Sequence, residues 1–415
     1  MDANWASLGL RFTEPVRDPL WKNILLPAEF MPVVESPQFV QLSRIMQLGP
    51  AQLVYPGATH TRRAHSLGVF EMARRILGAL LERGASGIVT PAGSRAFLMA
   101  ALCHDLGHFP YAHSLKELPL AEHEALTARR LAGPLAGALS SAGIDPGLAA
   151  AIVDQDLPGD GAELGFYRAL LSGVLDPDKL DYLNRDAWAC GVPYGLQDVD
   201  FVLQHVGLED GRPGISAAGS MAVEGVLFSK YRMYRAVYWH KTVRSATAMI
   251  KKAVSAALAS GSLVPDMLYG LDDAGFYALM AGPERDPDSL VSSVAAGRLL
   301  KPCLELPWDG ANPACLRAAD LSLRPALEAE LSIALGEPGR PALVVVDLPE
   351  PISFESDLPV LGTGSGFSAL ATVFRPETVA AFSRALRVLR VYSDRDPARA
   401  HAAAAEAYGL PTGSA

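Results

Sequence analysis

The chain has 415 residues, of which 50% are hydrophobic and 20% charged, and its formal net charge at pH 7 is −9. This composition supplies a sizeable core and room for two or three domains, and it excludes a non-specific nucleic-acid binder, which needs a broad cationic face. No segment approaches the roughly 20 apolar residues of a membrane span, the first residues lack a signal-peptide pattern, and the four cysteines have no metal-site spacing. We therefore expect a cytoplasmic protein with reduced thiols, no membrane segment and no sequence-specific nucleic-acid partner.

Abundant alanine and few β-branched runs favour helix. After an irregular arm at residues 6–33, apolar residues recur at helical spacing in several stretches; these are 37–48, 65–80, 97–103, 122–135, 178–186 and 224–260. Between these helices, the turn sequence Glu209-Asp210-Gly211 suggests a hairpin near residues 206–223.

The pattern changes from Pro341 onward. We expect strands at Leu343–Val346, Thr372–Phe374 and Val388–Tyr392, and a helix at Val379–Leu389. The sequence thus predicts a mainly α fold with a small C-terminal α+β domain. Its predicted parts are an N-terminal arm at 1–35, a helical core at 36–260, a helical extension of short helices at 261–340 and the α+β domain at 341–415.

Three histidines and an aspartate lie within residues 102–113, directly after an apolar run that predicts a buried helix. Adjacent His104 and Asp105 are unfavourable to bury without a partner, and a divalent metal binds neutral imidazole and carboxylate together. His104 and His108 share a helix face if the helix continues that far. The alternative interpretation is a helix end capped by polar residues.

Further metal ligands must come from elsewhere in the chain. His65, at the start of a predicted helix, is one candidate, and Asp178 or Asp181 is another, between which spacing does not choose. Asp181 and Arg185 have the spacing of an ordinary i,i+4 ion pair, which we favour as the interpretation of Asp181. Two imidazoles and two carboxylates would leave positions open for water and substrate, as in a hydrolytic site.

Basic residues cluster in the same segments, where Arg offers a fork for phosphate oxygens and Lys a point charge. They are Arg62, Arg63, Lys179, Arg185, Lys230, Arg232, Arg235 and Lys241. Tyr231, Tyr234, Tyr238 and Trp239 interleave with them and offer planes for a sugar or base. Solvated helix faces and a core stripe are the alternative interpretations of these two sets.

Several motifs within about residues 36–250 occur in the same order as in a known family. They are 47–49, 54–62, 65–69, 102–113, 123–124, 178–186, 191–195 and 238–241. Together they resemble the HD-domain phosphohydrolases, in particular the branch of deoxynucleoside triphosphate triphosphohydrolases. The resemblance implies a helical HD core and metal-dependent hydrolysis of deoxynucleoside triphosphates. Metal-activated water would attack the α-phosphorus and release deoxynucleoside and triphosphate.

The resemblance also implies roles for single residues. The metal ligands would be His65, His104, Asp105 and Asp178, and the ion would be Mg, Mn, Fe, Co or Zn. His113 would protonate the leaving 5′ oxygen, and the catalytic set also includes His108, His123 and Glu124. Phosphate oxygens would contact His108, His123, Arg62, Lys179 and Lys230. The deoxyribose would face Gln47, Tyr182 and Asp186, and Tyr234 and Tyr238 complete the substrate-binding set.

The chain departs from its relatives at some of these places. Lys116 stands where relatives often have an acidic residue, three positions after the general acid, and Glu117 would orient His113 only on a helix. Tyr234 replaces a histidine of some relatives, and Trp239 replaces a polar residue, so substrate choice does not carry over. The resemblance implies a homo-oligomer, dimer or tetramer, and leaves a nucleotide activator open. The alternatives are a phosphatase or phosphodiesterase for nucleoside monophosphates or other phosphoesters, and a nucleotide-binding sensor with little turnover.

Overall fold

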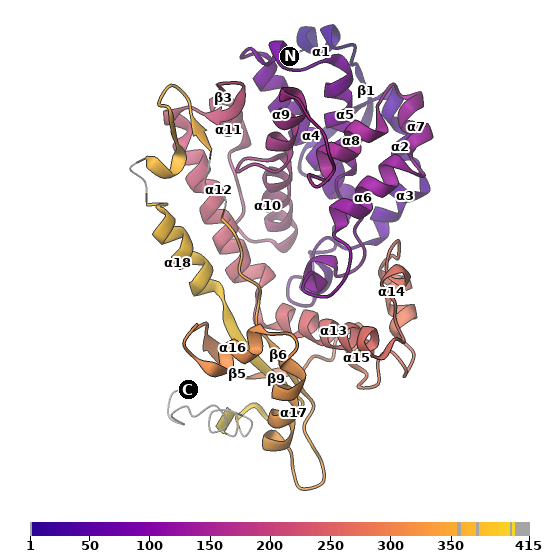
Figure 1. Ribbon diagram of the computed structural model, residues 1–415, viewed down its shortest axis with the longest axis vertical. Coiled ribbons are helices and arrows are strands. Elements are labelled where there is room, and N and C mark those ends of the chain that lie inside the picture. Colours follow the sequence, from indigo (N-terminus) through magenta and orange to yellow (C-terminus); the bar gives the residue numbers. More distant parts are fainter. Residues whose placement is uncertain (1, 355–357, 371–372, 399–400, 403–415) are drawn as a thin grey trace.

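The computed structural model describes residues 2–354, 358–370, 373–398 and 401–402. Helices dominate this part of the chain, which confirms the predicted mainly α fold class. In Figure 1 the N-terminal helices form the upper body, α13 (Lys241–Ser260) crosses beneath them, and a small sheet with α16 (Pro313–Ala319) and α17 (Arg324–Leu335) lies at the lower end. No helix in the described ranges is both long and apolar enough to cross a membrane.

The predicted irregular arm is wrong for residues 12–27, which form an antiparallel hairpin. Strand β1 (Phe12–Asp18) pairs with β2 (Lys22–Pro27), and Val16 lies opposite Ile24. The Asp18 carboxylate closes the turn by accepting hydrogen bonds from the backbone N–H groups of Leu20 (2.9 Å) and Trp21 (2.7 Å). Because β1 is largely polar and half-exposed, its sequence lacks the apolar alternation that reveals a strand.

Short helices α1, α2 and α3 flank this hairpin, and longer helices follow it. Their bounds are α1 (Asp2–Ser7), α2 (Met31–Val34), α3 (Pro37–Gln41), α4 (Arg62–Leu81), α5 (Pro91–Cys103), α6 (His123–Ala132), α7 (Ala136–Ser141), α8 (Pro146–Val153), α9 (Ala162–Leu171), α10 (Pro177–Cys190) and α11 (Val199–His205). Local chemistry sets several of these ends. Thr90 caps α5 by accepting a hydrogen bond from the N–H of Gly93 (3.0 Å), and Pro91 is the first residue of α5. Gly191 ends α10 in a left-handed conformation (φ 67°) that glycine adopts readily.

The predicted single helix over 224–260 is wrong, because the chain turns between α12 (Ser220–Met233) and α13 (Figure 1). One π-helical turn at Tyr234–Tyr238 ends α12, with the Trp239 N–H donating to the carbonyl of Tyr234 (2.8 Å). His240 then caps α13 by accepting from the N–H of Thr242 (3.3 Å). Apolar spacing continues through the turn, so the break carries no periodicity signal.

The predicted hairpin near 206–223 is confirmed as β3 (Val206–Glu209) and β4 (Arg212–Ile215). Asp210 (φ 50°) and Gly211 (φ 73°) make the two-residue turn, which requires positive φ at both positions. Strand β4 continues into a small sheet with β7 (Pro359–Val360) and β8 (Ser365–Gly366), where Ile215 lies opposite Val360 in a parallel pair.

The lower sheet has the order β5–β9–β6, with β9 (Val388–Ser393) in the centre. Val391 lies opposite Leu304 of β5 (Lys301–Pro307) on one side and Val346 of β6 (Val344–Asp347) on the other. The strands predicted at 343–346 and 388–392 are therefore confirmed, and the helix predicted at 379–389 is α18 (Pro376–Leu386). For the strand predicted at 372–374, Thr372 lies outside the described residues, and Val373 and Phe374 are not in a strand.

Helices α14 (Asp273–Met280) and α15 (Leu290–Ala295) precede β5 and pack beside α13 in a shared apolar core. Strand β5 falls inside the predicted helical extension, so the expectation of helices alone is wrong at 301–307. Its sheet joins residues from both sides of the predicted boundary at 341. The division into four parts stays a prediction.

Candidate active site

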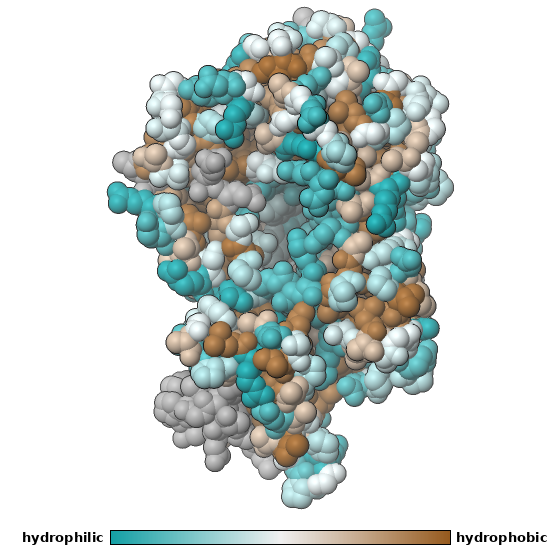
Figure 2. Space-filling model, viewed as in Figure 1, coloured by the Kyte–Doolittle hydropathy of each residue, from teal (hydrophilic) through white to brown (hydrophobic). Residues whose placement is uncertain are grey.

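A cavity of about 990 Å³ lies between the upper helical body and α13, a volume within the usual range of ligand pockets. Figure 2 shows this face of the molecule hollowed, with hydrophilic side chains around the hollow. All predicted site residues except His108 and Glu124 line the cavity. They are Gln47, Arg62, His65, His104, Asp105, His113, His123, Asp178, Lys179, Tyr182, Asp186, Lys230, Tyr234 and Tyr238.

Close packing of α4 on α10 brings His65 to Asp178. Asp176 starts α10 by accepting a hydrogen bond from the N–H of Lys179 (2.6 Å), with a proline as the first helical residue. Gly68 permits the contact, because a Cβ at this position would lie 1.9 Å from Oδ1 of Asp181. Nε2 of His65 consequently lies 3.0 Å from Oδ1 of Asp178.

His65 has its two ring nitrogens in different surroundings. Nδ1 lies 2.9 Å from Oδ2 of Asp181, which also accepts from Nε of Arg185 (2.8 Å), so the predicted Asp181–Arg185 ion pair is present. Donation from Nδ1–H to a carboxylate is the usual way in which a ligand histidine is oriented. Burial by itself lowers the pKa of His65, but its hydrogen bonds to Asp178 and Asp181 raise it to about 10.

A cation fits the cluster that these residues form with His104. One ligand atom from each of His65, His104 and Asp178 lies within 4.8 Å of the others. Nδ1 of His104 lies 2.9 Å from the carbonyl of Ala101 and donates to it, so Nε2 is the ring nitrogen left to bind a cation. This buried Nε2 makes no hydrogen bond with any residue that the structure describes, and it lies 3.3 Å from Oδ1 of Asp105 and 3.8 Å from Oδ1 of Asp178. A lone pair facing two carboxylates is stabilised by a positive ion between them.

The helix that precedes this cluster ends early. Because α5 ends at Cys103, the condition under which His104 and His108 would share a helix face is not met. The chain turns at Gly107, where a Cβ would lie 2.0 Å from the carbonyl oxygen of His123. Thr127 holds the turn, since its Oγ1 accepts from the Gly107 N–H (2.7 Å) and donates to the His104 carbonyl (2.9 Å).

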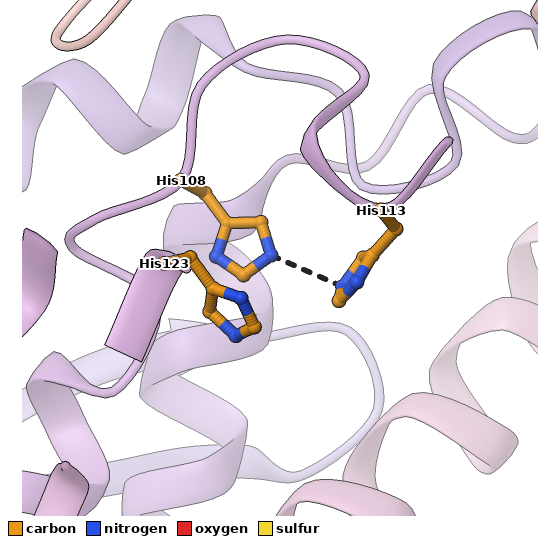
Figure 3. Close-up of side chains that lie close together, drawn as sticks. All are labelled: His108, His113 and His123. Atoms are coloured by element: carbon orange, nitrogen blue, oxygen red, sulfur yellow. Dashed lines mark hydrogen bonds between the residues drawn. The ribbon is translucent and has the colours of Figure 1, made fainter. Parts of the chain in front are cut away.

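This turn places three imidazoles together, as Figure 3 shows. The ring of His108 has its centroid 3.9 Å from that of His123 and 4.7 Å from that of His113, and Nε2 of His108 lies 3.0 Å from Nε2 of His113. Burial and the nearby Arg62 guanidinium lower the pKa of His108 to about 3 and that of His113 to about 4, although His113 is exposed to the cavity. Both rings are therefore neutral at pH 7, each with one N–H and one lone pair.

The three predicted phosphate-binding cations already have protein partners. Nη1 of Arg62 donates to Asp105 (2.7 Å), whereas its buried Nε has no hydrogen-bond partner in the described part of the chain. Nζ of Lys179 donates to the Asp176 carboxylate (2.7 Å), and Nζ of Lys230 donates to the carbonyl of Ser353 (2.8 Å). Burial raises the pKa of Asp105, but His108, His104 and Arg62 together hold it well below its usual value.

The predicted deoxyribose side contains a residue that sequence reasoning missed. Nε2 of His60 lies 2.8 Å from Oδ1 of Asp186, and the Tyr238 hydroxyl donates to Oδ2 of the same carboxylate (2.7 Å). Beside this group, Oε1 of Gln47 is buried and accepts no hydrogen bond from the described residues. The only signal for His60 was its place inside the motif at 54–62.

Two acidic residues do not contact the cavity as expected. Glu117 forms ion pairs with Lys251 of α13 and Arg324 of α17, and the helix on which it would orient His113 is not formed. The reason is local geometry, because His113 lies in a single 3₁₀ turn (Ala112–Leu115) and not in an α-helix. Glu124 lies 3.1 Å from Nδ1 of His123, so any role in the reaction would act through that ring.

The sequence analysis assigned no role to some other cavity residues, of which only Tyr111 lies inside a motif, the one at 102–113. Tyr111, Asp273, Tyr277 and Glu350 line the cavity, and the hydroxyls of Tyr111 and Tyr277 lie 2.6 Å apart. Tyr111 adopts a left-handed backbone (φ 65°), which is unfavourable for a non-glycine residue and is common at functional sites.

Comparison with known proteins shows where similar sequences occur. The family described as "HD associated region" matches residues 197–408. The chain is 33% identical over 232 residues to the uncharacterized protein YwfO of Bacillus subtilis, and the aligned segment covers 54% of this chain and 51% of the relative. It is 30% identical over 269 residues to the uncharacterized protein MJ1154 of Methanocaldococcus jannaschii, and this alignment covers 64% of this chain and 54% of the relative. The chain thus spans about half the length of these curated relatives.

A shorter match links the chain to a protein of named activity. Over 104 residues it is 40% identical to the deoxynucleoside triphosphate triphosphohydrolase SAMHD1 of Danio rerio, which covers 24% of this chain and 17% of the relative. Two solved structures share the fold. One is a hypothetical protein from Aquifex aeolicus (TM-score 0.71, 23% identity, 94% and 99% of the two chains), and the other is a phosphohydrolase from Bacteroides thetaiotaomicron (TM-score 0.71, 22% identity, 92% and 100%).

Proposed function

Because the chain belongs to the HD-domain phosphohydrolases, we propose that it hydrolyses deoxynucleoside triphosphates to deoxynucleoside and triphosphate with the help of a divalent cation. One observation carries this proposal: His65, His104 and Asp178 converge at a cavity that also contains Arg62, Lys179 and Lys230. The imidazoles and the carboxylate can bind a cation, and the positive side chains can bind negatively charged phosphate groups.

The cation would be held by His65, His104, Asp105 and Asp178, and Mg, Mn, Fe, Co and Zn all accept such nitrogen and oxygen ligands to some degree. When bound, it supplies positive charge for the phosphate groups and a lower pKa for water. Asp181 supports this set from behind, because it accepts from Nδ1 of His65 and leaves Nε2 directed at the cavity.

The cations of the cavity would bind the polyphosphate. Among the described residues, Nζ of Lys230 donates to the Ser353 carbonyl and Nζ of Lys179 donates to the Asp176 carboxylate. Both ammonium groups line the cavity, where a phosphate oxygen would accept charge-assisted hydrogen bonds from them. The unpaired Oε1 of Gln47 would accept a hydrogen bond from the sugar hydroxyl.

His113 would supply the proton to the leaving 5′ oxygen. Its ring is neutral in the free protein, because burial and Arg62 lower its pKa to about 4. A phosphate group beside the ring adds negative charge and raises this pKa. We therefore propose that His113 gains its proton when the substrate binds and donates it as the P–O bond breaks.

The direct test incubates the purified chain with each deoxynucleoside triphosphate and each of the five metals, and separates the products by chromatography. We expect nucleoside and triphosphate, with no turnover by Asp105→Ala or in chelator. Products limited to mono- and diphosphates would contradict the reaction.

A parallel series with other nucleotides present tests for an activator. Light scattering tests the proposed homo-oligomer, a dimer or tetramer.

A phosphatase or phosphodiesterase activity is the second candidate. One observation favours it: both carboxylate oxygens of Asp186 already have partners, so this residue has less capacity to select a 3′ hydroxyl. Nucleoside monophosphates and other phosphoesters belong in the same assay. Thermal stabilisation by nucleotides without product formation would instead indicate a binding sensor.

A further inference from the structure

We propose that His108, His113 and His123 form a second metal site, which binds zinc and chemically similar cations separately from the centre at His65, His104 and Asp178. The two centres share no ligand. The binding itself does not depend on the proposed function; only its consequence for turnover rests on that function.

The three rings converge from separate parts of the chain. His108 follows the turn after α5, His113 lies in the 3₁₀ turn, and His123 is the first residue of α6 (Figure 3). One ligand nitrogen from each ring lies within 4.8 Å of the other two. Nε2 of His108 and Nε2 of His113 are already 3.0 Å apart, so a small separation of these nitrogens admits an ion between them.

Carboxylates stand beside the other nitrogens of two rings. Nδ1 of His108 lies 3.1 Å from Oδ1 of Asp105, and Nδ1 of His123 lies 3.1 Å from Oε2 of Glu124. In metal sites, a carboxylate near one ring nitrogen orients the ring and makes the opposite nitrogen the better ligand. The buried Nδ1 of His108 has no hydrogen bond among the described residues, so it gains a partner if the ring adjusts to an ion at Nε2.

The ligand chemistry selects the cation. Three imidazoles without a direct carboxylate ligand suit Zn²⁺, Co²⁺, Ni²⁺ and Cu²⁺, whereas Mg²⁺ and Ca²⁺ require oxygen ligands. The first centre offers carboxylates as well as imidazoles and therefore accepts a wider range of ions. His113 is exposed to the cavity, so an ion reaches the three rings from the same side as a substrate.

Occupation of this site has a chemical consequence. A cation takes the lone pair of His113 that would otherwise receive the catalytic proton. It also takes the ring nitrogens of His108 and His123 that would contact phosphate oxygens. Zinc at the three histidines and turnover therefore exclude one another.

The test counts metal ions per chain. The full chain is stripped with a chelator, dialysed against a zinc buffer of fixed free concentration, and analysed by mass spectrometry for bound metal. We expect two zinc ions in the wild type, one in His113→Ala, one in His123→Ala and one in His65→Ala. His205→Ala is the matched control and keeps two, because this half-buried histidine contacts Ser216 and does not line the cavity. Dialysis against Mg²⁺ should load no more than one ion.

Cobalt distinguishes the two centres directly. His65→Ala loaded with Co²⁺ should keep the visible absorption of a nitrogen-bound ion, and the double variant His65→Ala/His113→Ala should lose it. His113 is exposed, so its replacement leaves the core intact even if His123→Ala fails to fold. One zinc in the wild type, or two in His113→Ala, overturns the inference.

The metal count and the hydrolysis assay fail independently. Hydrolysis is assayed with Mg²⁺ or Mn²⁺ and without zinc, so that the three histidines are free. Two zinc ions in the metal count, together with no triphosphate release in this zinc-free assay, would support the second site and contradict the proposed function. One zinc in a chain that hydrolyses its substrate would do the reverse.

Discussion

Asp178 and Asp181 lie three residues apart on α10, yet they do different things. Asp178 faces the cavity with 38% of its side chain exposed, and it meets Nε2 of His65. Asp181 is fully buried and binds Nδ1 of the same ring, the Trp21 indole N–H and Arg185. Positions three apart on a helix lie only about 60° apart around its axis, so both side chains project from one face toward the same ring. One carboxylate meets Nε2 of His65 at the cavity and the other meets Nδ1 in the interior.

We expect Asp178→Asn to lose the metal ion of the centre at His65, His104 and Asp178 and at least a hundredfold in turnover, with little change in stability, because the side chain borders the open cavity. Asp181→Asn should instead lower the free energy of unfolding by about 2–3 kcal/mol, since it leaves buried Arg185 with Asp18 as its remaining carboxylate partner. Metal analysis and urea unfolding of both variants check this. Equal metal loss without destabilisation in the second variant would contradict the division of roles.

Gln47→Leu should reduce kcat/KM about tenfold, because it removes an acceptor worth about 1.4 kcal/mol to the transition state. Its thermal stability should stay the same or rise, since the buried Oε1 accepts no hydrogen bond within the described ranges of the chain. The control is Gln204→Leu, a change at an exposed position. A fall in melting temperature together with unchanged kinetics would show that Gln47 is structural.

At the scale of elements, the cavity depends on how α13 meets the lower sheet. Arg244 of α13 donates from Nε to Oδ2 of Asp347 on β6 (2.9 Å), and both groups are buried. Glu117 adds a second link, because it joins the turn that carries His113 to Lys251 and Arg324. The catalytic turn, α13 and the C-terminal region are thus connected through buried ion pairs.

Asp347→Asn should lower the free energy of unfolding at pH 7 by about 3 kcal/mol, because it leaves the Arg244 guanidinium buried without a counter-charge. Burial by itself raises the pKa of Asp347, but Arg244 lowers it below its ordinary value. The unfolded chain therefore binds more protons than the folded chain in acid, and the pair's stabilisation is full above about pH 4 and lost as pH falls through the folded pKa.

The difference between wild type and this variant should accordingly shrink below about pH 4. Urea unfolding at pH 7 and pH 3 measures it, with Asp266→Asn as the control at an exposed carboxylate. A difference that stays constant across this range would mean that the Asp347 charge does not stabilise the fold.

At the scale of the whole molecule, segments from the C-terminal region contact the helices that surround the cavity. The centre of the lower sheet is β9, and the Tyr392 hydroxyl of this strand donates to the carbonyl of Lys241 (2.8 Å) at the start of α13. The backbone of Ser353, from the connection after β6, contacts Lys230 of α12. Residues separated by more than 100 positions therefore share one cavity.

Val391→Asp should remove about 4 kcal/mol or more of stability, because it places a charge in the fully buried centre of the sheet. Loss of the sheet should also reduce hydrolysis, since it supports α13. The same substitution at half-exposed Val264 is the control and should change the melting temperature little. Full activity of the Val391→Asp chain at 25 °C would show that the site does not depend on the lower sheet.

The sequence by itself determined the mainly helical fold, the hairpin at 206–223 and the strands β6 and β9, and its resemblance to a known family implied most of the residues that line the cavity. Helix spacing, caps and turn residues act within about four positions, so they can be read locally. Tertiary structure alone decided that His60 meets Asp186, that Glu117 pairs with Lys251, and that the chain turns between α12 and α13. These depend on contacts between distant segments, such as the approach of α4 to α10 at Gly68, and no local pattern encodes which distant partner a side chain meets.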